Sequence, residues 1–539
     1  YTVDTYNIIR TKRPNSSRSF PVNQANTKPN IYAIKAITEV YGVDKANEVV
    51  NNYKRGKITI EAIVKDIYRM NSKGRNRPDC TYYQQALKLY TSTIKPNVPF
   101  KTVHFCGVRF YDLNKSGSAE LPYTKDEKFK KYIDDAFDAG LIENKSLSKG
   151  NGMDYILTRE RNIIHLIKDG QYTVTNAEYT QAHSRSHLTS SFKEDKVRFV
   201  AGAPCTMIFI EIMLLWPLIN QEIKRKDSFI AWNYATFKGG LIKLKDEFSG
   251  AKFILNLDFK AFDKLIPFYL IDDLHQIIYN FCDKESYYID DPNHRNPVAI
   301  RERIDRLWKF MNSYFKEAIY VVPDGSCYKR KHSGLASGLL QTQFIGSSCN
   351  FIFIASSLLS YGLNESDFKI KVLGDDSCIA IYADVNPKSL LNHMSKYCFD
   401  KFGAIINIEK SEIRTIDNIS FLGYQVKHGA VCRVNDDLLG KLTYPEKPNF
   451  TPENNLSRAV GISISNLGYD ENIHHVCSSI IRRLQTHDIF NTRLNWYDKT
   501  KLHHVIKKHG IQPSRKDLLT LGRVYSDEIP DTNFDKYLN

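Results

Sequence analysis

The sequence lacks the cysteine spacing of a disulfide framework or a structural zinc site. Its ten cysteines are scattered along 539 residues, with no CxxC pair and no paired zinc spacing. We therefore expect reduced thiols in an intracellular protein. Adjacent histidines occur at 474–475 and 503–504 without spaced partner ligands, which favours surface or core histidines over a metal site.

The sequence also lacks a clean apolar segment of the kind that crosses a membrane. Residues 199–220 are interrupted by Pro204, Glu211 and Pro217. Residues 333–364 carry no formal charge but are crowded with Ser, Gln, Thr and Asn, whose exposure to lipid is costly. We expect both segments to be buried in a large soluble core, and we predict no membrane partner.

Acidic side chains are in the minority. The chain has 75 Lys and Arg against 60 Asp and Glu, a formal net charge of +15, and 12% aromatic residues. This balance favours a large polyanion as partner over a small neutral metabolite, although a capsid or membrane-surface protein would share it. The length allows two to four domain-sized units or one multi-lobed enzyme.

Short apolar runs alternate with helical segments in the middle third of the chain, which predicts a sheet backed by helices. The expected elements there are a strand at 253–257, a helix at 266–282, a polar insertion at 283–300, a helix at 301–318 and a hairpin around 371–381. Outside it we expect an extended arm at 11–30, helices at 31–41 and 60–67, a basic strand at 196–199, and helices followed by an acidic tail after about 430.

Two adjacent aspartates, Asp375 and Asp376, interrupt the apolar stretch KVLGDDSCIA. Gly374 before them permits a tight turn, so the stretch predicts two strands joined by a hairpin with both carboxylates at its tip. A solvated turn is one interpretation, because Asp and Gly are ordinary turn residues. The other is a site where a counter-charge or a metal ion offsets the cost of desolvation.

A second acidic segment, FILNLDFKAFD, favours the metal interpretation. Its apolar strand ends in Asp258, and Asp263 follows five positions later. If this strand lies beside the hairpin, Asp258 and Asp375 converge and could share divalent cations, since carboxylate oxygens suit Mg²⁺. Two such ions clamp the attacking and leaving oxygens in phosphoryl transfer. Taken alone, Asp258 could instead be a helix N-cap.

Between the acidic sites lies GLASGLLQTQFIGSSCN, residues 334–350. Gly334 and Gly338 allow the backbone to approach a ligand closely, and Ser337 and Thr342 supply hydroxyl groups before a buried helix. An ordinary junction between a loop and a helix would have the same composition.

In this order the motifs resemble those of viral RNA-dependent RNA polymerases. Motifs A, B and C correspond to D-x4-D (Asp258, Asp263), SG-x3-T-x7-N (Ser337, Gly338, Thr342, Asn350) and GDD (Gly374, Asp375, Asp376). KVRFVAGAP at 196–204 resembles motif F, IEKSE around Lys410 resembles motif D, and FLGY at 421–424 resembles motif E.

Within this superfamily the chain is most similar to partitivirus-type polymerases of double-stranded RNA viruses. The similarity rests on the strings GDDS, TQFIGSSCN and KVRFV and on the overall length. Its many Lys, Asn, Ile and Tyr residues suggest AT-rich coding, as in a virus of a protozoan such as a cryspovirus. Two positions depart from the familiar pattern. Ala336 stands where Pro is expected, and Gly346 stands where picornavirus-like enzymes have an Asn that helps to read the ribose.

The resemblance implies a role for each matching residue. Asp258 and Asp375, supported by Asp376, would ligate Mg²⁺ or Mn²⁺, and Lys410 would act as general acid toward pyrophosphate, unless it is an ordinary solvated lysine. Lys196 and Arg198 would hold the triphosphate, and Asp263 would accept a hydrogen bond from the ribose 2′-hydroxyl. The remaining substrate-binding residues would be Ser337, Gly338, Thr342 and Asn350.

The resemblance also implies an α+β right-hand fold whose palm is an antiparallel sheet backed by helices. We expect the N-terminal arm and fingers at 1–240, the palm at 241–430 with a fingers insertion at about 270–330, and a helical thumb with a C-terminal tail at 431–539. The implied partners are viral RNA template and product, nucleoside triphosphates and capsid protein. The expected location is the virion interior and the host cytoplasm.

Two alternatives stay open at this point. A reverse transcriptase would carry a bulky aromatic residue at the position of Asp263, whereas here the aromatic residue, Phe262, comes one place earlier. An RNA-packaging structural protein would use the positive charge only to neutralise phosphates, and its RNA binding would be equally sensitive to salt.

Overall fold

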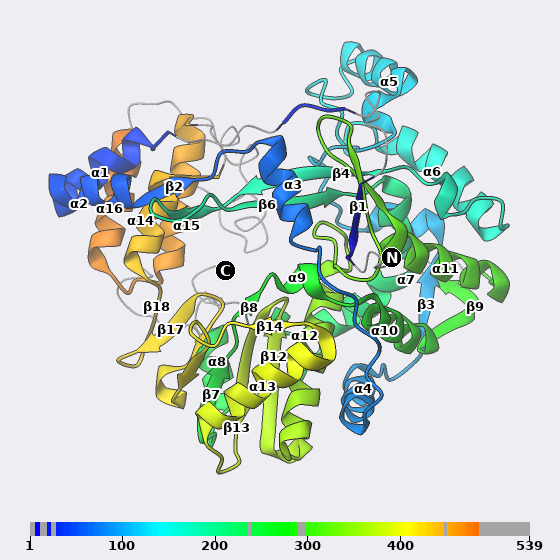
Figure 1. Ribbon diagram of the computed structural model, residues 1–539. Helices are drawn as coiled ribbons and strands as arrows, with labels where there is room; N and C mark the ends of the chain where they lie inside the picture. Colours follow the sequence, from blue (N-terminus) through cyan, green and yellow to red (C-terminus); the bar gives the residue numbers. More distant parts are fainter. Residues whose placement is uncertain are drawn as a thin grey trace.

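The computed structural model describes residues 6–10, 19–22, 28–234, 239–288, 297–446 and 450–484. Three lobes surround the centre of the molecule in Figure 1, and we call them palm, fingers and thumb. Most of the expected arm at 11–30 and the chain after 484, including the expected acidic tail, lie outside the described residues.

The palm is built on a four-stranded antiparallel sheet with the strand order β12-β13-β7-β15. The strands are β7 (Phe253–Asn256), β12 (Phe368–Leu373), β13 (Asp376–Ile381) and β15 (Glu412–Arg414). Its helices are α8 (Gly240–Glu247), α9 (Phe262–Leu265), α10 (Phe268–Asn280), α12 (Thr342–Tyr361) and α13 (Pro387–Phe402). Shorter strands are β8 (Phe259–Lys260), β14 (Ile405–Ile406), β16 (Ser420–Phe421), β17 (Tyr424–Lys427) and β18 (Ala430–Cys432).

Both faces of the palm sheet are buried. Leu255 and Ile379 point into the larger core, which includes residues of α12 and α13, while Ile254 and Cys378 point into a second core shared with α8 and the thumb. Successive side chains of a strand point to opposite faces, so nearly continuous apolar strands are what this sandwich requires. The prediction of a sheet backed by helices is confirmed.

The fingers contain a five-stranded sheet with the order β1-β11-β10-β4-β6. Its strands are β1 (Ile8–Arg10), β4 (Thr180–Ser186), β6 (Val197–Gly202), β10 (Ile319–Val321) and β11 (Cys327–Arg330). Two smaller pairs are β2 (Tyr53–Arg55) with β5 (Leu188–Ser190), and β3 (Phe100–Val103) with β9 (Cys282–Tyr288). The helices are α3 (Ile60–Tyr68), α5 (Glu127–Asp138), α6 (Met153–Lys168), α7 (Cys205–Lys224) and α11 (Arg301–Glu317). Helix α4 (Thr81–Ile94) packs against α12 of the palm.

Several expected elements are confirmed within a few residues. The basic strand is β6, and the helices predicted at 266–282 and 301–318 are α10 and α11. The polar insertion expected at 283–300 begins within β9, which pairs in parallel with β3. Residues 289–296 of that insertion lie outside the described residues.

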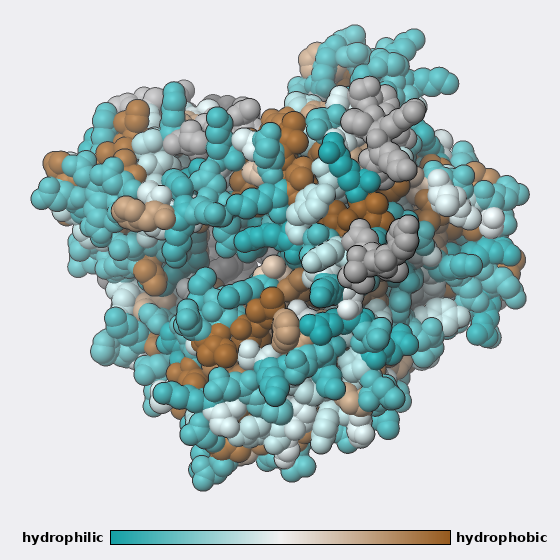
Figure 2. All heavy atoms as spheres, viewed as in Figure 1, coloured by the Kyte–Doolittle hydropathy of each residue, from teal (hydrophilic) through white to brown (hydrophobic). Residues whose placement is uncertain are grey.

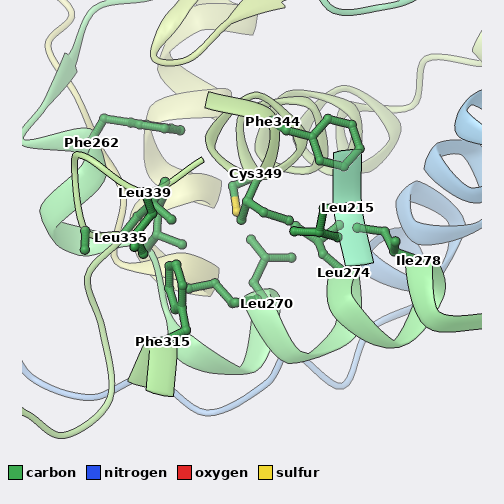
Figure 3. Close-up of a cluster of buried hydrophobic side chains, with 14 of the residues drawn as sticks. Leu215, Phe262, Leu270, Leu274, Ile278, Phe315, Leu335, Leu339, Phe344 and Cys349 are labelled. Atoms are coloured by element: carbon green, nitrogen blue, oxygen red, sulfur yellow. The ribbon is translucent and has the colours of Figure 1, made fainter. Parts of the chain in front are cut away.

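The two uncharged segments form α7 and α12, which are long and apolar enough to cross a membrane by length and composition alone. In their most apolar windows, 67% and 89% of the residues are buried inside the protein, as expected for core helices. Figure 3 shows labelled side chains of this core from α7, α9, α10, α11, α12 and the segment before α12: Leu215, Phe262, Leu270, Leu274, Ile278, Phe315, Leu335, Leu339, Phe344 and Cys349.

The thumb combines helices from the C-terminal part of the described chain with two helices from near its N-terminus. Helices α14 (Asn435–Thr443), α15 (Pro452–Asn466) and α16 (Glu471–Arg483) pack against α1 (Ile31–Tyr41) and α2 (Val43–Asn52). Asn30 Nδ2 donates to Asn455 Oδ1 at 3.0 Å, and Glu39 accepts from Arg483 Nη2 at 2.7 Å. Residues 30–52, which the sequence analysis assigned to the arm and fingers, thus pack with the thumb helices, while the division at 240 stays a prediction. The face shown in Figure 2 is mostly hydrophilic, in keeping with the charged composition.

Candidate active site

The GDD hairpin has the predicted form. Gly374 and Asp375 make the turn between β12 and β13, and Asp376 is the first residue of β13, paired with Leu373. Gly374 has φ +66°, a conformation that glycine adopts without steric cost. The turn is held from behind by α12, because Asn350 Nδ2 donates to the Gly374 carbonyl at 3.0 Å and Gly374 N–H donates to Ser347 Oγ at 2.8 Å.

The strand that carries Asp258 lies next to this hairpin. Strand β7 pairs antiparallel with β13, with Leu255 opposite Ile379, and continuing this register places Asp258 directly across from Asp376. Directly opposed residues have Cβ atoms about 4.5–5.5 Å apart. Two further bonds fix the backbone at this point, since Asp258 N–H donates to Ser411 Oγ at 3.0 Å and the Asp258 carbonyl accepts from Asn407 N–H at 2.7 Å.

The three carboxylates repel one another. The pKa of Asp376 is raised to about 6, chiefly by the protein that surrounds it and then by the negative charges of Asp375 and Asp258, while Arg198 opposes the shift. The Asp376 side chain is nevertheless exposed to solvent, so water weakens this repulsion. None of the three carboxylates makes an ion pair with a described residue.

This donor set fits a divalent cation. Mg²⁺ is usually bound through one or two protein carboxylates plus phosphate oxygens and water, and within the described residues Arg198 and Lys196 lie near these carboxylates without forming an ion pair with them. Within the described residues, no three His, Cys, Asp or Glu side chains form a ready-made metal cluster. The arrangement therefore leaves room for oxygens supplied by a substrate.

The predicted basic strand faces the carboxylates. In β6, Val197 and Phe199 are buried while Arg198 between them is exposed. Lys196 is exposed at the surface, but the protein beside it removes part of its hydration, which is the main cause that lowers its pKa; the positive charges of Arg198 and Lys410 lower it further, and Asp258 acts in the opposite direction. Three cationic residues from two separate motifs are thus close enough to interact electrostatically with one another and with the acidic residues: Lys196, Arg198 and Lys410.

A cavity of about 320 Å³ joins several of these groups. Asp258, Asp376 and Lys410 line it together with the FLGY segment at 421–424. Lys410 is exposed, and its backbone N–H donates to the Asn407 carbonyl at 3.2 Å. Motifs A, C, D and E therefore share one cavity.

The glycine-containing segment before α12 passes close to the strand β6. Gly338 has φ +110°, and a Cβ atom on it would lie 2.3 Å from the Ala201 carbonyl oxygen, so only glycine fits here without a shift. The Ser337 carbonyl accepts from Ala201 N–H at 2.6 Å. Thr342 Oγ1 donates to the Ala336 carbonyl at 2.6 Å, so this hydroxyl connects the start of α12 to the loop that precedes it.

Two predicted substrate residues differ in accessibility. Asp263 is the second residue of α9, its side chain is 37% exposed, and its carbonyl accepts from Leu335 N–H at 2.6 Å. Asn350 is fully buried behind the hairpin turn, and its predicted contact with substrate stays a prediction. As placed, its amide supports Gly374.

Sequence reasoning missed the residues that hold this loop. The buried Glu211 of α7 accepts from Leu340 N–H at 3.0 Å and from Gln341 Nε2 at 2.7 Å. The buried Arg330 donates to the Gly334 and Phe315 carbonyls. The signal for Glu211 was its position as a lone charge in an apolar stretch, which the sequence analysis counted as an interruption.

Comparisons with known proteins show the family to which the chain belongs. A family model described as "Viral RNA-dependent RNA polymerase" matches residues 27–482. The RNA-directed RNA polymerase of Atkinsonella hypoxylon virus (isolate 2H) is 28% identical over 451 residues, which cover 74% of this chain and 66% of that protein. The corresponding enzyme of White clover cryptic virus 1 (isolate Boccardo/2004) is 25% identical over 469 residues, covering 77% and 76%.

The fold also matches a solved structure. The Sicinivirus 3Dpol RNA dependent RNA polymerase has a TM-score of 0.65 to this chain at 12% sequence identity, covering 96% of this chain and 99% of that one. The expected α+β right-hand fold is confirmed.

Proposed function

The chain belongs to the viral RNA-dependent RNA polymerases, and from this premise we propose that it copies RNA by joining nucleoside triphosphates to a growing RNA 3′ end. The resemblance to partitivirus-type polymerases is confirmed by the two viral relatives. The observation that carries the proposal is the register of β7 and β13, which sets Asp258 across from Asp376 beside Lys196 and Lys410.

The carboxylates of Asp258 and Asp375, with Asp376 in support, would hold Mg²⁺ or Mn²⁺. Bound there, a pair of such ions would stabilise the attacking and leaving oxygens of the phosphoryl transfer. The hydrogen bonds from α12 to Gly374 keep the turn that carries Asp375 in place before substrate arrives. Preorganisation of this kind lowers the barrier because the site does not have to rearrange during the reaction.

The cationic residues complete the site. Lys196 and Arg198 would bind the triphosphate by charge-assisted hydrogen bonds, and their exposure on the edge of the fingers sheet supports this role. Lys410 would donate a proton to the leaving pyrophosphate, a contribution of roughly 10² to 10⁴ in rate. Asp263 would read the ribose 2′-hydroxyl, while Ser337 and Gly338 would lie against template and nucleotide.

The biological setting follows from the relatives. We propose a double-stranded RNA virus in which this enzyme carries out genome replication and transcription, inside the virion and in the host cytoplasm, with capsid protein as a partner. The absence of a membrane partner and the link to a cryspovirus stay predictions. The ribonucleotide preference that separates this proposal from a reverse transcriptase is tested by comparing ribo- and deoxynucleotide incorporation. A clear preference for deoxynucleotides would overturn it.

The decisive variant is Asp375→Asn. Removing a metal-binding carboxylate costs several kcal/mol of transition-state stabilisation, so we expect Mg²⁺-dependent incorporation to fall at least about 100-fold with RNA affinity unchanged. Asp384→Asn, an exposed carboxylate beyond the other end of β13, is the matched control. Survival of incorporation in Asp375→Asn would disprove the metal site, and a protein that only packages RNA would show no incorporation in either variant.

A further inference from the structure

Lys264, the residue directly after Asp263, is a buried lysine. Its side chain is only 5% exposed, and its ammonium group lies 3.0 Å from Asp66 Oδ2 and 3.4 Å from Asp263 Oδ2. The same group sits 5.2 Å from the centre of the Phe199 ring. A buried ammonium group persists when it is paired, so these two carboxylates account for its burial.

Asp66 connects this lysine to the basic strand of the fingers. It lies in α3, its side chain is 3% exposed, and its Oδ2 atom also accepts from Phe199 N–H at 2.7 Å. Phe199 directly follows Arg198 in β6. One buried carboxylate therefore links the strand that carries a triphosphate-binding arginine to the helix that carries Asp263.

The pairing leaves half of the Asp263 carboxylate free for another partner. Oδ2 faces Lys264, whereas no described donor is bonded to Oδ1, and the side chain is 37% exposed. The attraction of a buried, paired ammonium group for one carboxylate oxygen favours the rotamers that keep this oxygen on the side of Lys264. The second oxygen is then presented in a preferred direction.

We propose that Asp66 and Lys264 form a positioning relay that sets the selection of ribonucleotides. The relay holds the Asp263 carboxylate at a fixed distance from the triphosphate-binding strand, so that a 2′-hydroxyl group meets Oδ1 when the triphosphate is in place. This inference rests on the proposed sugar-reading role of Asp263. Asp66 and Lys264 are positioning residues, because both are buried and act through Asp263.

The test measures kcat/KM for each ribonucleotide and its 2′-deoxy analogue on a primed RNA template. We expect Lys264→Met to lower the ribo-to-deoxy ratio by about 10- to 100-fold, because a displacement of about 1 Å at a reacting group can cost 10²-fold. Lys252→Met, an exposed lysine just before β7, is the matched control and should leave the ratio unchanged.

A second variant separates positioning from stability. Lys264→Met alone leaves Asp66 buried without its main counter-charge, which is destabilising. In the double variant Asp66→Asn/Lys264→Met, the buried charge is removed and the Asn side-chain oxygen can still accept from Phe199 N–H. This protein should recover thermal stability but keep the reduced ribo-to-deoxy ratio.

The outcomes distinguish the relay from the sugar-reading role itself. In an Asp263→Ala background, Lys264→Met should change the ratio by less than about twofold, since coupled residues are not additive. An equal effect in both backgrounds, an unchanged ratio in the single variant, or loss of all incorporation in the folded double variant would overturn the relay. If Asp263→Ala leaves the ratio unchanged, the sugar-reading assignment falls and the relay falls with it.

Discussion

The substitution Asp258→Asn should make the metal-free protein more stable at neutral pH. Asp258 lies across from Asp376 and is one of three causes that raise the pKa of Asp376 from 3.8 to about 6. The whole shift corresponds to about 3 kcal/mol. Burial and Asp375 contribute more than Asp258 does, and the exposed side chain is screened by water, so we expect a gain of about 0.5 kcal/mol.

The gain should depend on pH with a defined sign. A carboxyl group whose pKa is higher in the folded state opposes folding as it ionises, and this cost develops as the pH rises from about 3.8 to about 6. Relief of the repulsion by Asp258→Asn should therefore be fully present at pH 7 to 8. It should become small near pH 4, because Asp376 is then largely protonated in the folded protein and no longer repels Asp258.

Mg²⁺ should reverse the order of stability. An ion that binds the folded protein at about 100 times its Kd stabilises it by about 2.7 kcal/mol, and Asp258→Asn removes a ligand for that ion. Chemical denaturation at pH 8 should find the variant more stable than the wild type without Mg²⁺ and less stable with it. Asp384→Asn should behave as the wild type. A variant destabilised without metal, or one stabilised equally by Mg²⁺, would refute the reasoning.

Three other substitutions test the loop and the turn. Burial raises the pKa of Glu211 to about 7, so the free energy of unfolding of the wild type should fall as the pH rises from about 4.5 to 7. In denaturation measurements Glu211→Gln should remove this pH dependence. If the pH dependence persists, Glu211 is not its source. Gly338→Ala should lower the free energy of unfolding by about 1–3 kcal/mol and should reduce nucleotide incorporation. Gly140 also has a positive φ, but a Cβ atom there would meet nothing within 4 Å, so Gly140→Ala should lower the free energy of unfolding by less. Equal losses in the two variants would argue against a close approach of Gly338 to Ala201. Asn350→Leu should lower kcat about tenfold with RNA affinity unchanged, and an unaltered kcat would remove its supporting role.

The acidic strands could be predicted because their signals are local. An apolar run ending in Asp258 and a GDD hairpin each need only a few neighbouring residues to specify a strand and a turn. Their register could not be predicted, since it depends on a pairing between β7 and β13 across more than a hundred residues. A shift of one residue would turn Asp258 to the opposite face of the sheet.

The residues missed by sequence reasoning are buried charges with distant partners. Lys264 follows Asp263 and reads as one more surface lysine until Asp66 of α3 is brought beside it. The amphipathic pattern of residues 31–41 predicts a helix, but it does not say which surface the apolar face meets. In the folded chain that surface is formed by the thumb helices, a long-range contact that the local pattern cannot reveal.

The two halves of the site share one electrostatic property. One half of the site holds the carboxylates at the palm hairpin, and the other holds the cations on β6 and at Lys410. Repulsion between like charges disfavours the charged form of Asp376 in the first half and of Lys196 in the second. Arg198 and Asp258 partly offset this across the gap between the halves. A ligand relieves both sets of repulsion when it carries negative phosphates for the cations and divalent cations for the carboxylates. A nucleoside triphosphate bound with Mg²⁺ has both, so its binding energy would be realised where the proposed reaction takes place.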